Sequence, residues 1–261
     1  MRKKSAVVIL LTLDLAYAGL ACNRLGTGVG REAGFVATSS HRGQLQTMRT
    51  DIATATRFVG KTDAEGFPVD SAWEIAAPIR FSADWQGLNG DPQRETRVRL
   101  LWTPENLYLR FEAGYRVITV FPDADADGRR DKLWDRDVCE AFLQPDPAEV
   151  RHYKEIEVAP NGFWIDLAIG PGEKHDLQSG LRRRVDVDTA GKSWRAVLAL
   201  PMKSLVQHFD SSVVWRVNFY RVEGAAEPRF YSAWQPTRTA QPNFHVPEAF
   251  GRLVFAEGSG K

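Results

Sequence analysis

The sequence has little cysteine, little net charge and no long apolar run. Its 261 residues include two cysteines, Cys22 and Cys139, and 34 basic against 33 acidic residues give a formal net charge of +1. This balance gives no broad electrostatic basis for binding nucleic acid or an anionic membrane. A disulfide would tie Cys139 to the leader segment around Cys22, so we expect none. Cys139 is instead predicted to be a small buried hydrophobic residue.

The motifs of several enzyme and cofactor classes are also missing. The five histidines are scattered without an H-E-x-x-H pattern, and there is no G-x-S-x-G motif. The three methionines, Met1, Met48 and Met202, give little support to a sandwich that binds haem or transfers electrons. The sequence therefore predicts no required cofactor.

The first 21 residues have the pattern of a secretory signal. Positions 2–4 are basic, positions 6–13 are apolar, and Ala-Tyr-Ala at 16–18 offers a cleavage site. Cys22 follows Gly-Leu-Ala, an imperfect match to a lipoprotein cysteine, so simple secretion and a lipid anchor on the outer surface both stay open. A periplasmic location fits the same leader. Residues 22–50 are rich in Gly, Ser and Thr and are predicted to be a flexible linker.

Residues 51–257 are predicted to form one all-β domain. The chain is 43% hydrophobic, enough for one sizeable core, and it combines eight Trp, fourteen Phe and six Tyr with fourteen Pro and twenty-one Gly. This mixture favours strands and turns over a helical bundle. Alternating apolar residues indicate about ten strands. Three pairs of them form predicted hairpins: 96–103 with 107–111, 153–160 with 162–169, and 182–187 with 193–200. We therefore expect a two-sheet antiparallel β-sandwich of jelly-roll type with few short helices.

Strand alternation also sorts polar residues onto one face of three strands. Glu140 lies on one strand, Glu155 and Glu157 on the next, and Asn218 on a late strand. The apolar residues on their opposite faces, predicted to point into the core, are Cys139, Ala141, Leu143, Ile156, Val158, Trp215, Val217 and Phe219. The polar face could hydrogen-bond the hydroxyls of a sugar, or it could be a solvated face with Arg–Glu pairs. Alternation alone leaves both possibilities open.

Six stretches, taken in order, resemble carbohydrate-binding module family 9 and its standalone secreted relatives. They are TRVRLLWTPENLYLRFEA (Thr96–Ala113), LWDRDVCEAFLQP (Leu133–Pro145), YKEIEVAPNG (Tyr153–Gly162), WRAVLALP (Trp194–Pro201), WRVNFYRVE (Trp215–Glu223) and FHVPEAFGRLVF (Phe244–Phe255). The resemblance implies a β-sandwich that binds oligo- or polysaccharide of glucan or xylan type without catalysis. It also implies a supporting role in polysaccharide breakdown or uptake.

The resemblance further implies that a sugar lies between two aromatic rings. The first ring matches Trp134, and Phe244 stands where a second Trp is usual. Glu140 matches a glutamate that hydrogen-bonds the sugar, and Asn218 falls at an amide position. The family has an arginine on the strand at 153–160, where this chain offers Glu155 and Glu157 instead. These roles are physically reasonable because sugar C–H faces stack on aromatic rings while hydroxyls bond to carboxylates and amides.

Four aspartates precede Trp134 and resemble the start of a calcium-binding loop. They are Asp123, Asp125, Asp127 and Asp131. The glutamate expected at the end of such a loop is replaced by Trp134. Modules of family 9 often carry structural calcium, so these residues are a hypothetical calcium site. A solvent-exposed acidic loop is the alternative.

The alternative function is glycoside hydrolysis. Glu140 together with Glu155 or Glu157 could form a pair of carboxyl groups about 5 Å apart for a retaining enzyme, or up to about 9.5 Å apart for an inverting one. The chain has the length and strand order of a binding module, and nothing in it indicates a deep cleft. Binding is therefore the preferred interpretation.

Overall fold

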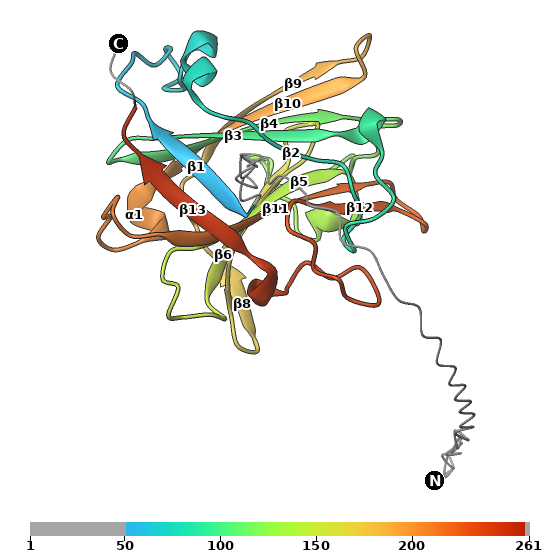
Figure 1. Ribbon diagram of the computed structural model, residues 1–261. Coiled ribbons are helices and arrows are strands. Elements are labelled where there is room, and N and C mark those ends of the chain that lie inside the picture. The colour runs from blue at the N-terminus through green and yellow to red at the C-terminus, as the bar shows by residue number, and fades with distance from the viewer. Residues whose placement is uncertain (1–50, 259–261) are drawn as a thin grey trace, which may run out of the picture. The chain divides into compact units, whose positions relative to one another are not determined.

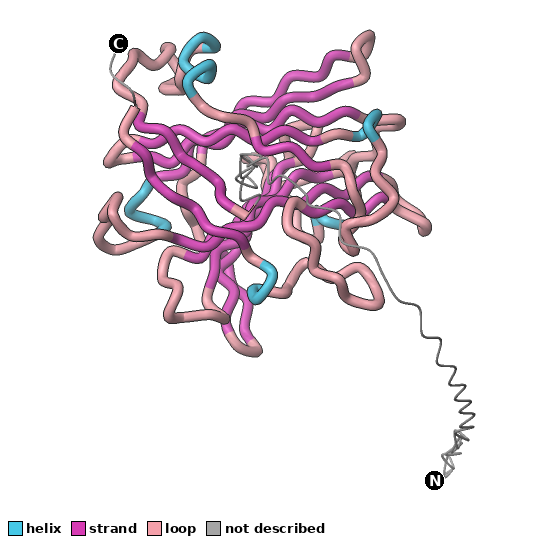
Figure 2. The backbone as a smooth tube through the Cα atoms, in the orientation of Figure 1, coloured by secondary structure: helices cyan, strands magenta, loops and turns pink. Residues whose placement is uncertain are grey.

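The computed structural model describes residues 51–258, and nearly all regular structure in this range is β-strand (Figures 1 and 2). The predicted all-β sandwich is confirmed. The predicted leader (1–21) and the predicted linker (22–50) lie outside the described residues. Within residues 51–258, no helix is long and apolar enough to cross a membrane.

The strands of the first group all come from residues 138–256 and pair with one another entirely antiparallel. In spatial order it consists of β8 (Glu173–Asp176), β7 (Trp164–Gly170), β6 (Tyr153–Val158), β5 (Val138–Gln144), β11 (Trp215–Glu223) and β13 (Gly251–Ala256), with β12 (Phe230–Ala233) also on β11. The glutamate-bearing strands β5 and β6 therefore lie side by side near the middle of this group.

The second group of strands is also antiparallel, and a single strand connects it to the first. It consists of β3 (Thr96–Trp102), β4 (Asn106–Gly114), β10 (Ser193–Pro201) and β9 (Arg182–Asp188), with β2 (Ile79–Phe81) on β3. Strand β1 (Ile52–Arg57) pairs in parallel with both β13 and β3. Figure 1 shows β1 running beside β13, so the two ends of the described chain meet in the sheet. The predicted antiparallel pairing thus holds everywhere except at β1.

The three predicted hairpins are present as β3–β4, β6–β7 and β9–β10. Each consists of alternating residues joined by a turn whose residues tolerate the required backbone geometry. In the β6–β7 turn, Gly162 has φ +83°, which a residue without a side chain adopts at little cost. These local signals were sufficient to predict the hairpins.

Three strands were not predicted. Strand β1 (IATATR) carries small and hydroxyl side chains and pairs only with strands distant in sequence. Strand β2 is three residues long. Strand β8 (EKHD) lies at the edge of the first group and is exposed along its whole length, so no apolar alternation marks it.

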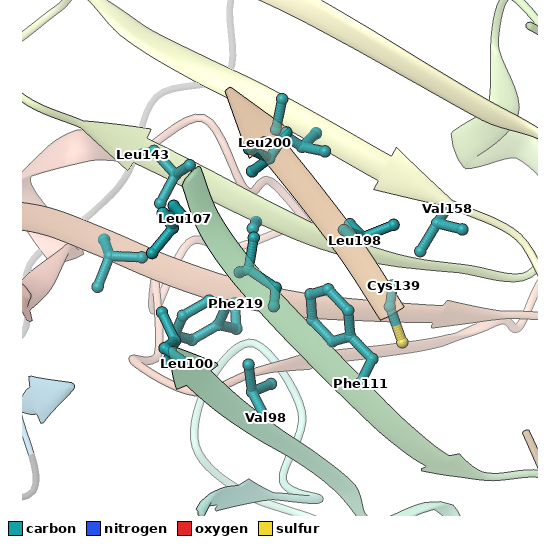
Figure 3. Close-up of a cluster of buried hydrophobic side chains, with 14 of the residues drawn as sticks. Val98, Leu100, Leu107, Phe111, Cys139, Leu143, Val158, Leu198, Leu200 and Phe219 are labelled. Carbon is teal, nitrogen blue, oxygen red and sulfur yellow. The ribbon is translucent and has the colours of Figure 1, made fainter. Parts of the chain in front are cut away.

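The main core lies between the two groups of strands. Figure 3 shows Leu107 and Leu198 from the second group together with Leu143, Val158 and Cys139 from the first. All eight residues predicted to face the core belong to this cluster. The sorting of residues by strand alternation is confirmed.

Short helical segments connect the strands. They are the 3-10 turns η1 (Asp70–Ile75), η2 (Pro92–Arg94), η3 (Leu133–Asp135) and η4 (Pro247–Ala249) and the α-helix α1 (Met202–Leu205). Segment η3 carries Trp134 and leads directly into β5, so it positions this ring at the start of a glutamate-bearing strand.

Candidate functional site

The outer faces of β5, β6 and β11 are covered by a second apolar cluster. Phe142, Tyr153 and Tyr220 from these strands pack with Phe244 and Phe250 from the C-terminal segment. The polar face is therefore buried, and the alternative of a solvated face with Arg–Glu pairs is wrong. Every residue of β5 is buried because the strand has packing partners on both sides.

A pocket of about 320 Å³ opens on this second cluster. Its lining residues are Trp134, Glu140, Phe142, Glu155, Lys174, Val222, Arg229, Tyr231, Pro242, Asn243, Phe244 and His245. The volume lies in the range of pockets that hold small ligands, and the lining combines aromatic rings with a few polar groups, as such sites do. Four of the six predicted carbohydrate-binding residues meet here, from three regions far apart in sequence.

Trp134 is half-buried and held from two sides. Its carbonyl oxygen accepts a hydrogen bond from Nη1 of Arg229 at 2.8 Å, which connects η3 to the start of β12. The Nζ atom of Lys174 lies 3.8 Å from the centroid of the Trp134 ring. The ring is thus a fixed platform whose face attracts a cation.

Phe244 is held by stacking on a tyrosine. Its ring lies 4.2 Å from that of Tyr220 at an interplanar angle of 12°, and the Tyr220 hydroxyl donates to the Phe244 carbonyl at 3.0 Å. Tyr231 contacts Phe244 nearly edge-on, at 6.1 Å and 73°. With one face covered and its backbone bonded, Phe244 presents an ordered apolar surface to the pocket.

Three glutamates lie together on β5 and β6. Glu140 is directly opposite Glu157 in the strand register, and Glu155 lies on the same strand as Glu157, two residues earlier. All three are at most 2% exposed. Oε1 of Glu140, Oε2 of Glu155 and both carboxyl oxygens of Glu157 have no hydrogen-bond partner among residues 51–258. Glu157 is not part of the pocket lining.

Burial controls the protonation of this cluster. Burial first, and then the neighbouring Glu155 carboxyl, holds the pKa of Glu140 well above its usual range. Burial followed by the carboxyls of Glu140 and Glu155 raises the pKa of Glu157 in the same direction. In the described part of the chain, one cation lies within 4.0 Å of these carboxylates: Nζ of Lys174 is 3.9 Å from Oε1 of Glu155.

Asn218 is fully buried below the pocket and does not line it. Its Nδ2 donates to the Tyr220 hydroxyl at 2.8 Å and to the Gln235 carbonyl at 2.9 Å. Its Oδ1 accepts from the backbone N–H groups of Phe219 and Gln235. These four bonds use the hydrogen-bonding capacity of the amide, so Asn218 orients Tyr220, which in turn holds Phe244.

Several lining residues were not predicted from the sequence. Asn243 and His245 flank Phe244, so their position beside a candidate ring was the available signal. Nδ1 of His245 is 2.7 Å from the Tyr153 hydroxyl, and burial lowers the pKa of this histidine. Lys174 gave no signal, because it lies on the exposed strand β8.

The four aspartates before Trp134 are not arranged as a metal site. No group of three or more Asp, Glu, His or Cys side chains in residues 51–258 is placed to hold a metal ion. Asp123 is 3.9 Å from the Arg130 side chain, and Oδ1 of Asp127 accepts from the backbone N–H of Arg129. The segment closes a turn beside arginines, so these residues do not fit the calcium ion that the resemblance implied.

A larger pocket, of about 470 Å³, lies over β3, β4, β9 and β10. Most of its charged side chains are already paired: Arg195 is 3.2 Å from Asp186, and Arg97 is 2.6 Å from Glu95. This surface offers few free groups to a ligand, so the pocket at Trp134 is the stronger candidate.

Comparison with known proteins places the chain in a family. The pattern of carbohydrate-binding family 9 matches residues 82–255. The chain belongs to carbohydrate-binding family 9. Modules of this family bind carbohydrate without catalysis, so this chain is a non-catalytic carbohydrate-binding protein and the glycosidase alternative is set aside. The resemblance noted from the sequence is confirmed.

Solved structures of similar fold agree with this assignment. A Bacteroides uniformis protein provisionally described as carbohydrate-binding aligns with a TM-score of 0.63 at 18% identity, over 78% of this chain and 99% of that one. A family 9 module from Caldicellulosiruptor kristjanssonii in complex with cellotriose aligns with a TM-score of 0.56 at 15% identity, over 80% and 95%. Among curated proteins, an "Extracellular protein" of Arthroderma benhamiae is 23% identical over 181 residues, 63% of this chain and 80% of that protein.

Proposed function

We propose that the pocket at Trp134 holds one sugar unit against Trp134 and Phe244. The observation that carries the proposal is the convergence of these two rings with the carboxyl groups of Glu140 and Glu155 on one pocket. Sugar rings present C–H faces to aromatic rings and hydroxyl donors to carboxylates. Glu157 and Asn218 act from below the pocket, the first through Glu140 and the second through Tyr220.

The ligand is proposed to be an oligo- or polysaccharide of glucan or xylan type. The solved family 9 module of similar fold was crystallised with cellotriose and, in another structure, with glucose. The signal pattern at 1–21 and the "Extracellular protein" relative support action outside the cytoplasm, with a lipid anchor on Cys22 as the more specific possibility. There the protein would support polysaccharide breakdown or uptake.

Titration calorimetry with cellotriose, xylotriose and glucose tests this function. Trp134→Ala removes a half-buried platform and is expected to weaken binding about tenfold, which corresponds to about 1.4 kcal/mol. Leu88→Ala, a truncation of an exposed apolar side chain away from the pocket, is the matched control and should bind as the wild type does. Equal affinity of wild type and Trp134→Ala would refute the platform role, and a folded protein that binds none of the sugars would refute the function.

A further inference from the structure

The pocket is lined by two buried glutamates and by three basic side chains, Lys174, Arg229 and His245. Glu140 and Glu155 line it, each is 2% exposed, and each has one carboxyl oxygen without a hydrogen-bond partner within residues 51–258. Glu157 is directly opposite Glu140 in the strand register. A buried carboxylate is stable only with a cation, a proton or several donors. A neutral sugar offers these oxygens hydroxyl donors, whereas a protonated amine offers donors together with a positive charge.

Lys174 already shows what kind of group the pocket accommodates. Its Nζ atom lies 3.8 Å from the centroid of the Trp134 ring and 3.9 Å from Oε1 of Glu155. An ammonium group therefore lies on the aromatic platform, beside a buried carboxylate. The lysine comes from the exposed edge strand β8, and its side chain is 36% exposed. A contact with this much exposure is weak, so a ligand can displace it.

A ligand that displaces Lys174 must supply a group that bonds to the unpartnered oxygens of Glu140 and Glu155. A divalent metal is not a suitable replacement, since the described residues contain no group of ligands arranged for one. A primary ammonium is suitable, because it donates three hydrogen bonds and is attracted both to carboxylates and to the face of an indole ring.

We propose that the pocket selects sugars that carry a free protonated amine, the hexosamines, over neutral sugars. The ligand ammonium takes the place of Lys174 Nζ beside Trp134 and bonds to the carboxylates of Glu140 and Glu155. This inference rests on the proposed carbohydrate-binding function and specifies its substrate class. Lys174 then serves as an internal competitor that covers the site in the absence of sugar.

Titration calorimetry on the full chain at pH 6 tests the proposal with glucosamine, glucose and N-acetylglucosamine as probes. Glucosamine and glucose differ by the amine that replaces one hydroxyl, and N-acetylation removes the charge. Wild type should bind glucosamine at least about tenfold more tightly than glucose, as expected for a desolvated charge pair. The preference should vanish at a pH where the sugar amine is neutral.

Variants assign the preference to named groups. Glu140→Gln and Glu155→Gln keep the side-chain shape and should each reduce the preference for glucosamine to less than about threefold. Glu173→Gln, which changes an exposed carboxylate on β8, is their control and should leave the preference unchanged. Lys174→Ala should raise the affinity for glucosamine, whereas Lys203→Ala, an exposed lysine on α1, should not. Melting curves identify any variant that fails to fold. If one of the two variants Glu140→Gln and Glu155→Gln fails, the other still tests whether a carboxylate binds the ligand ammonium.

The possible outcomes separate this inference from the function on which it rests. Equal binding of glucosamine and glucose by wild type overturns the amine preference and leaves carbohydrate binding intact. A folded protein that binds none of the three sugars overturns both. Tighter binding of ethanolamine than of glucosamine overturns the assignment to a sugar, because the ring would then contribute nothing.

Discussion

Glu157→Gln should make the protein more stable near neutral pH without removing its binding surface. Glu157 is fully buried, both of its carboxyl oxygens lack a partner in the range 51–258, and it lies outside the pocket lining. Its pKa is raised by burial and by the carboxyls of Glu140 and Glu155. The substitution removes an ionisable group from this cluster. The new amide can donate to the free oxygens of its neighbours.

The sign of the pH dependence follows from the raised pKa. The folded protein holds the Glu157 proton more tightly than the unfolded chain does. The resulting stability is fully present below the unfolded pKa of about 4.3 and is lost as pH rises toward the folded pKa. Each pH unit between the two values removes about 1.4 kcal/mol for this group. At pH 7.5 we therefore expect Glu157→Gln to be more stable than wild type by about 1–3 kcal/mol, the general cost of a buried polar group without a partner, and to melt several degrees higher.

Urea unfolding and thermal melts at pH 4 and pH 7.5 measure the effect. At pH 4 the glutamate is protonated in the folded state and mostly protonated in the unfolded chain, so the two proteins should differ by less than about 1 kcal/mol. Glu74→Gln, which removes an exposed carboxylate, is the control and should change stability equally little at both pH values. A Glu157→Gln protein that is less stable than wild type at pH 7.5 would show that the buried carboxyl has stabilising partners, and the reasoning would fail.

Three further predictions concern the support of the pocket. Asn218→Ala should destabilise the protein by about 2–4 kcal/mol in urea unfolding, because it leaves two backbone N–H groups and the Tyr220 hydroxyl without the amide; unchanged stability would contradict its positioning role. Arg229→Gln removes the hydrogen bond to the Trp134 carbonyl, so it should weaken sugar binding several-fold while Tm stays within about 3 °C of the wild-type value. A large fall in Tm with unchanged affinity would contradict the role of Arg229 in positioning Trp134. Chelation by EDTA should leave Tm unchanged, since the described aspartates form no metal site; a clear fall in Tm would restore the calcium hypothesis.

The sequence predicted the hairpins and the core-facing residues because both depend on local alternation. Strand alternation fixes which residues share a face, as the burial of Cys139 and Val217 in the main core confirms. It does not reveal how deeply the other face is covered. Glu140 and Asn218 were correctly placed on that face, but their burial depends on the C-terminal segment that carries Phe244 and Phe250 and packs over them.

The two aromatic rings of the pocket could be predicted only because a resemblance supplied their positions. Trp134 and Phe244 are more than one hundred positions apart in the sequence, and no periodicity relates them. Lys174 lies on an edge strand with four exposed residues, whose place in the sheet depends on pairing with β7 rather than on its own composition. The cation that lies closest to the buried glutamates, Lys174, was therefore the lining residue with the weakest sequence signal.

The buried glutamates connect stability to binding. Their unpartnered oxygens lower the stability of the ligand-free protein, because a buried acceptor without a donor costs about 1–3 kcal/mol. A ligand that donates to Glu140 and Glu155 relieves that cost only in the folded state, so its binding adds to stability by mass action. The gain should shrink in Glu140→Gln, whose amide supplies its own donors. A sugar that shifted the Tm of wild type and Glu140→Gln equally would contact the rings without engaging the carboxylates.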